Sequence, residues 1–77
     1  MMAHAPPPGM SLDQIEGWPN YALDDHGVVW GFRQRWFKVH TYENYDGQTV
    51  VRLRHDPDSL DCEVVTLAEL RNLRKLS

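Results

Sequence analysis

The sequence has one cysteine, Cys62, and few positive charges. A single cysteine closes no disulfide within the chain and supplies no cysteine-based zinc site, which excludes the small secreted domains held together by disulfides. Lys and Arg number 8 against 11 Asp and Glu, a formal net charge of −3, whereas small domains that bind duplex DNA usually carry a basic surplus. No apolar run of about 18 residues and no secretory leader pattern occurs, so we expect a soluble, cytoplasmic protein that does not enter a membrane.

The sequence also lacks the spacings that mark catalytic and metal sites. His4, His26, His40 and His55 are scattered over a tail, a turn and two strands, without paired-His or C-x-x-C spacing. Cys62 has no base placed beside it by a motif, and there is no glycine-rich phosphate loop. We therefore expect no enzyme, no metal and no cofactor.

A chain of 77 residues makes one domain. Residues 1–10 contain Pro6, Pro7 and Pro8 and almost nothing apolar to bury, which predicts a disordered tail before a domain over residues 11–77. Ser11 with Gln14 has capping-box spacing and predicts a short helical turn over residues 11–16.

The rest of the chain predicts strands, tight turns and a final helix. Gly27 and the Asp46–Gly47 pair indicate turns, and a third reversal is expected at Arg33–Arg35. Thr66 and Glu69 form a second capping-box pattern that opens a C-terminal helix, which Leu67, Leu70, Leu73 and Leu76 would stripe and whose last turns would carry Arg71, Arg74 and Lys75. The expected strands are Tyr21–Leu23, Val28–Phe32, Trp36–Tyr42, Gln48–His55 and Cys62–Val65. We expect an α+β fold, a small antiparallel β-sheet of three to four strands with the helix packed on one face.

Positive charge is concentrated in two places. One place is the reversal with Arg33, Arg35 and Lys38, and the other is the expected strand Gln48–His55. Alternation along this strand places Val51 and Leu53 in the core and Arg52 and Arg54 on the outer face. These arginines either form an ordinary solvated face or bind an acidic surface, since guanidinium groups suit carboxylates and phosphates. The candidate partner-binding residues are Arg33, Arg35, Trp36, Lys38, Arg52 and Arg54.

Aromatic residues are numerous, and most are expected in the core. Trp30 and Phe32 are assigned to the core together with Val28, on one face of their strand. Trp36 and Phe37 are adjacent, so one of them should be exposed. An exposed aromatic beside Arg35 and Lys38 is a candidate contact for a partner.

Residues 15–30, which read IEGWPNYALDDHGVVW, resemble the nuclease-associated modular domain (NUMOD) of phage and intron HNH homing endonucleases. The resemblance extends loosely over residues 15–70 and implies a phage or mobile-element origin, a compact β-rich module and DNA binding beside a nuclease. Val28 and Trp30 stand where the family usually has basic residues, Gly31 stands for its Ser, and no HNH segment accompanies the module.

These departures and the acidic balance lead us to expect a free-standing derivative of the module, a monomer that binds a protein. The expected partner is a host protein machine, with RNA polymerase as the leading candidate, whose transcription the chain would inhibit or redirect. The alternative is a NUMOD-like DNA-binding module. DNA binding would weaken steeply as salt is raised, because counterions are released on binding.

Overall fold

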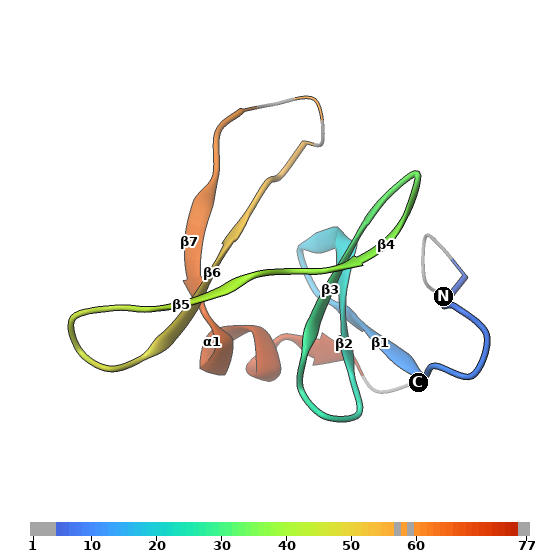
Figure 1. Cartoon of the computed structure of the whole chain (residues 1–77), viewed down its shortest axis with the longest axis horizontal. Coiled ribbons are helices and arrows are strands. Elements are labelled where there is room, and N and C mark those ends of the chain that lie inside the picture. Colours follow the sequence, from blue (N-terminus) through green and yellow to red (C-terminus); the bar gives the residue numbers. More distant parts are fainter. Residues whose placement is uncertain (1–4, 57, 59, 76–77) are drawn as a thin grey trace.

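The computed structural model describes residues 5–56, 58 and 60–75, and within them the chain forms eight strands in two antiparallel sheets and one short helix (Figure 1). The sheets have the strand orders β4-β3-β2-β1-β8 and β5-β6-β7. The elements are β1 (Leu12–Ile15), β2 (Trp18–Asp24), β3 (Val29–Arg33), β4 (Arg35–Lys38), β5 (Thr41–Glu43), β6 (Thr49–Leu53), β7 (Glu63–Thr66), α1 (Leu67–Asn72) and β8 (Arg74–Lys75). The antiparallel architecture and the single C-terminal helix are confirmed, but three to four strands was too low a number.

The two sheets share one core. Ile15, Leu23 and Val29 of the five-stranded sheet and Val51 and Leu53 of the three-stranded sheet are each 0% exposed. Each such side chain contributes about 1.5 to 3 kcal/mol through burial. Trp18, Val39, Val65 and Leu70 complete the cluster. The predicted inward placement of Val51 and Leu53 is confirmed.

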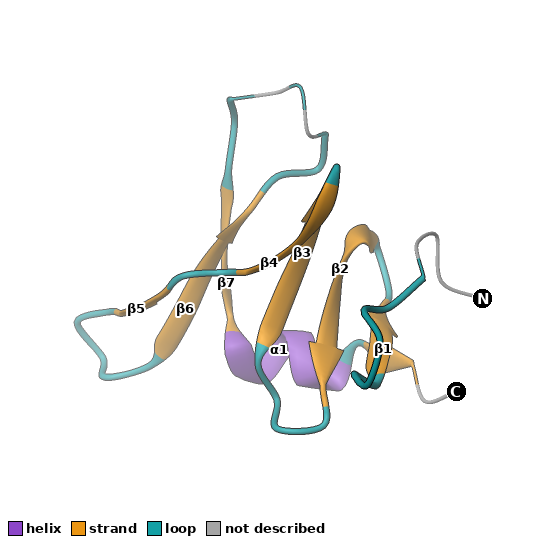
Figure 2. Ribbon diagram, turned by 45° about the vertical axis from the view of Figure 1, so that its right-hand side comes forward, coloured by secondary structure: helices purple, strands orange, loops and turns teal. Residues whose placement is uncertain are grey.

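The chain passes from one sheet to the other between β4 and β5. Figure 1 shows these two strands following one another as a nearly continuous ribbon. Val39, which lies between them, is buried, so the crossing is fixed in the shared core. Figure 2 places α1 at one end of the two sheets and both the β3–β4 turn and the β6–β7 loop at the opposite end.

The predicted turns are present. Gly27 and Gly47 have φ values of 80° and 77°, the left-handed region that glycine adopts without steric cost. Their N–H groups donate to the carbonyls of Asp24 and Asn44, each at 3.1 Å. At the third reversal Arg33 pairs directly with Arg35, and Gln34 between them takes φ 65°.

Two predicted helical segments are strands instead. Residues 12–15 lie between β2 and β8 and form hydrogen-bonded ladders with both, so backbone pairing overrides the capping pattern at Ser11. The helix ends at Asn72, and Arg74 and Lys75 pair with Ile15 and Gln14 as β8. Leu67, Leu70 and Leu73 contribute to the core as predicted, and Leu76 lies outside the described residues.

The core face of β3 was predicted wrongly. Val29 and Gly31 are buried, whereas Trp30 and Phe32 are only half-buried. Because Val29 packs in the core and side chains alternate along a strand, the inward positions are the odd-numbered ones. Phe37 pairs with Gly31 across the ladder, and a Cβ at Gly31 would stand 2.7 Å from the Phe37 ring.

Candidate functional site

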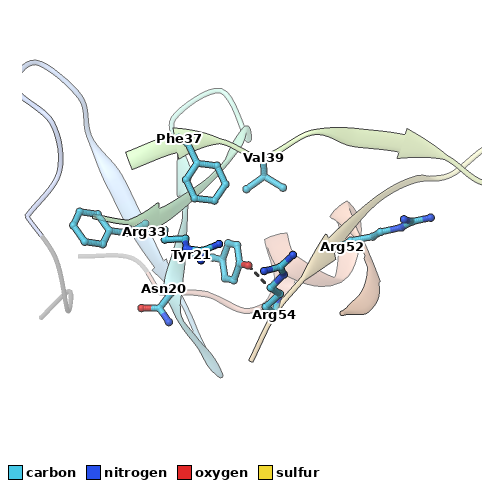
Figure 3. A pocket seen from close by; sticks show the side chains of 8 residues that line it. Asn20, Tyr21, Arg33, Phe37, Val39, Arg52 and Arg54 are labelled. Carbon is cyan, nitrogen blue, oxygen red and sulfur yellow. Dashed lines mark hydrogen bonds between the residues drawn. The ribbon is translucent and has the colours of Figure 1, made fainter. Parts of the chain in front are cut away.

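A pocket of about 240 Å³ opens where the two sheets meet (Figure 3). Its lining comes from β2, β3, β4, the β4–β5 crossing and β6, so it exists only once both sheets are assembled. The lining residues are Asn20, Tyr21, Phe32, Arg33, Phe37, Val39, Arg52 and Arg54. The pocket thus combines aromatic side chains with arginines, of which Arg52 extends away from it (Figure 3).

Tyr21 ties the two sheets together at this pocket. Its hydroxyl oxygen accepts a hydrogen bond of 3.0 Å from the backbone N–H of Arg54, which follows β6 (Figure 3). The Tyr21 ring also packs against the core and meets Trp18 edge-on, with ring centroids 6.1 Å apart. Because this bond uses the Arg54 backbone, the Arg54 guanidinium is not held by it.

The pocket arginines have no acidic partner within the part of the chain that the structure describes. Its ion pairs join Arg74 to Asp13, His26 to Asp25 and His55 to Glu63. No Asp or Glu lines the pocket. The Arg52 guanidinium lies over the Tyr42 ring, 5.1 Å from its centroid, a contact that leaves its positive charge uncompensated. The Arg52 side chain extends away from the hollow, so Arg33 and Arg54 are the two residues whose guanidinium groups make it an anion-binding environment (Figure 3).

An acidic loop follows the pocket in the sequence. His55, at the start of this loop, stacks on Trp18 with ring centroids 4.3 Å apart. The acidic side chains of the loop and of the first residue of β7 are exposed: Asp56, Asp58, Asp61 and Glu63. The described part of this loop lies at the end of the molecule away from α1 (Figure 2).

The structure separates the predicted site residues into two groups. Arg33, Arg52 and Arg54 line the pocket. Arg35 and Lys38 are exposed on β4 but do not line it. Sequence reasoning missed Tyr21 and left open whether Trp36 or Phe37 is the exposed aromatic, because nothing local shows that β2 and β4 converge on β6.

Trp36 faces away from Phe37, as neighbours in a strand do. It pairs across the ladder with Phe32, and the two rings meet edge-on with centroids 5.3 Å apart. The Trp36 indole N–H donates to the carbonyl of Ala5 at 2.7 Å. Part of the predicted tail therefore contacts the domain, whereas residues 1–4 lie outside the described residues. Phe37 is the more exposed of the two adjacent aromatics, at 43%.

Asp24 organises the β2–β3 turn through its carboxylate. One oxygen accepts from the N–H groups of His26 and Val28 at 2.9 and 2.8 Å, and the other accepts from the Trp30 indole at 3.0 Å. Burial disfavours the charged form, but these hydrogen bonds and the nearby His26 outweigh it, so the pKa of Asp24 lies below its ordinary value. The carboxylate therefore has a structural role, which is to hold the β2–β3 turn and the Trp30 indole.

The described residues offer no other chemical centre. They contain no group of three or more His, Cys, Asp or Glu side chains placed to hold a metal ion. Their helix is too short to cross a membrane. No family model, curated protein or solved structure matches the chain.

Proposed function

We propose that this chain is a small, non-catalytic regulatory protein of the phage type, which binds an acidic surface of a host protein through the arginine pocket. The observation that carries this proposal is that Arg33 and Arg54, without ion-pair partners among the described residues, line a hollow with aromatic walls, while Arg52 lines its edge and extends away from it (Figure 3). A carboxylate entering the pocket would meet several guanidinium donors, and an apolar neighbour of that carboxylate would pack against Phe37.

A protein partner fits the surrounding charge better than DNA does. The acidic loop next to the pocket would repel a phosphate backbone, and the chain carries a net charge of −3. A protein surface of mixed charge can match both signs, and such matching gives specificity and a faster association rate. The pocket is also a localised hollow between the two sheets rather than a basic track along a face.

The proposed host partner is RNA polymerase, and the proposed effect is to inhibit or redirect transcription by occupying a contact, such as that of a promoter-specificity factor. This target follows from the resemblance of residues 15–30 to a phage module, combined with an acidic composition and no catalytic motif. We propose that the chain forms a NUMOD-like domain that acts as a monomer in the host cytoplasm.

The test measures binding of the purified chain to bacterial RNA polymerase holoenzyme, together with transcription from a promoter template. We expect the double variant Arg33→Ala, Arg54→Ala to bind at least tenfold more weakly. A tenfold loss of affinity corresponds to about 1.4 kcal/mol, and removing arginines from the centre of an interface commonly costs at least this much binding free energy. Inhibition of transcription should fall in parallel.

Arg35→Ala and Lys38→Ala are the matched controls, because they remove positive charge from the same hairpin without touching the pocket. They should change the affinity by no more than about twofold, as exposed rim charges do at moderate salt. Equal loss in pocket and control variants would reject the pocket as the contact. No binding of the unaltered chain to the polymerase would reject this target.

DNA binding is the second candidate, because guanidinium groups bind phosphates as well as carboxylates and the resembled module accompanies nucleases. It predicts that the free chain retards a DNA duplex at low salt and that binding weakens as salt is raised. Each pocket arginine replaced by alanine should then reduce the slope of log affinity against log salt by about 1. If the free chain retards a DNA duplex at low salt but does not bind the polymerase, the result favours DNA binding.

A further inference from the structure

A second surface, on the face of the β3–β4 hairpin that carries Trp36, contacts the N-terminal segment through a hydrogen bond. Trp36 and Phe32 are cross-strand neighbours there, and both are half-buried. The carbonyl of Ala5 accepts the Trp36 indole hydrogen bond across 31 positions of sequence. Indole N–H is a donor only, so this surface requires an acceptor from some other group.

The segment that supplies this acceptor is rich in proline. Ala5 is followed directly by Pro6, Pro7 and Pro8, and the N–H of Met10 closes a turn onto the Pro7 carbonyl at 3.1 Å. Prolines fix φ and carry no N–H, so such a segment loses little conformational entropy on binding and presents its carbonyls outward. Proteins that bind proline-rich segments use aromatic surfaces for this reason.

We propose that Trp36 and Phe32 form a binding site for proline-rich segments, which the chain's own residues 5–8 occupy in cis. A proline-rich segment of a partner protein binds there by displacing the tail. The tail is tethered within a few residues of β1, and tethering gives it an effective concentration on the order of millimolar. A partner segment must therefore bind tightly enough to displace the tethered tail.

The site neighbours the arginine pocket but does not depend on it. Phe32 meets Trp36 on one side and also lines the pocket. A partner with prolines next to an acidic residue could thus contact both. The test below uses no arginine variant and no polymerase, so its failure leaves the proposed function standing, and the reverse also holds.

The experiment follows the three tryptophan indole N–H signals by NMR in the full chain and in a variant lacking residues 1–9. The probe is a synthetic peptide of residues 5–10. Truncation should shift the Trp36 signal, whereas the Trp30 signal, held by Asp24, should stay in place. Adding the peptide should return the Trp36 signal to its original position in a saturable way. The full chain should need at least tenfold more peptide for the same occupancy.

Three results would overturn the proposal. The Trp36 signal is indifferent to truncation, the truncated chain fails to bind the peptide, or a peptide with glycine at all three proline positions binds equally well. Trp36→Phe keeps a ring against Phe32 but removes the donor, and it should weaken peptide binding at least tenfold. If truncation unfolds the domain, a full-length chain with Pro6, Pro7 and Pro8 changed to Gly replaces it and should bind the peptide more tightly than the unaltered chain does.

Discussion

Among the described residues, Asp24 is the charged residue that is buried, with 7% of its surface exposed. Its burial is tolerable because both carboxylate oxygens accept hydrogen bonds, from two backbone N–H groups and the Trp30 indole. Its backbone carbonyl accepts in addition from the Arg74 guanidinium at 3.1 Å. One residue therefore connects the β2–β3 turn, the outer aromatic of β3 and the terminal strand β8.

We expect Asp24→Asn to lower the free energy of unfolding by about 1.5 to 3 kcal/mol, the usual range for hydrogen bonds to a charged group. The amide would place an N–H₂ donor against the donating groups now bound by the carboxylate. Chemical denaturation at pH 7 measures the change. Asp25→Asn, in the same turn but exposed, is the control and should change stability by less than about 0.5 kcal/mol.

The same substitution should alter the dependence of stability on pH. The pKa of Asp24 in the folded chain is lower than in the unfolded chain. Its stabilisation is therefore complete above the ordinary carboxyl pKa of about 4 and disappears as pH falls through the lowered value. Unfolding measured from pH 7 downward should show a steeper loss below about pH 4 in the unaltered chain than in Asp24→Asn. Parallel curves would contradict this assignment.

At the scale of elements, the short helix α1 begins at a well-formed cap. The Thr66 hydroxyl accepts from the Glu69 N–H at 3.1 Å, as the Thr-x-x-Glu pattern predicted. We expect Thr66→Ala to lower the free energy of unfolding by about 0.5 to 2 kcal/mol. Thr66→Ser keeps the hydroxyl and should stay close to the unaltered chain in the same denaturation experiment. Equal losses in both variants would place the cost in the lost methyl group instead.

The elements predicted correctly are those whose causes are local. Gly27 and Gly47 require their turns because of backbone conformation, and Thr66 caps α1 through its own side chain. The strands β1 and β8 were missed because their cause is distant. A leucine stripe and a capping pattern favoured helix at both ends, and the pairing of Ile15 with Arg74 prevails over those preferences.

The candidate site was predictable in kind but not in geometry. The clustering of positive charge and the alternation along one strand identified Arg33, Arg52 and Arg54 as candidate partner-binding residues. That Arg33 and Arg54 reach one pocket depends on how the two sheets pack, which places the end of β3 beside the end of β6, and no sequence pattern encodes that approach. The same reason explains why Trp36, predicted as a free contact, is engaged by Ala5 while Phe37 faces the pocket.

At the scale of the whole molecule, the hydroxyl of Tyr21 joins the two sheets. We expect Tyr21→Phe to lower the free energy of unfolding by about 1 kcal/mol, because the Arg54 N–H loses its acceptor. A looser junction between the sheets should also lower the affinity of the arginine pocket for its ligand. Thermal denaturation and the polymerase-binding measurement check the two effects. Tyr45→Phe, on a fully exposed ring, should leave both unchanged.

The pairing of β1 with β8 also sets the order in which the protein can be completed. One edge of β1 meets β2, which follows it closely, but the other edge meets Arg74 and Lys75. Ribosomes add about 5 to 20 residues per second, so β1 emerges well before its second partner exists. Until then its free edge exposes unpaired N–H and C=O groups, which other nascent chains can engage. The sheet is therefore completed only when residues 74 and 75 have left the ribosome.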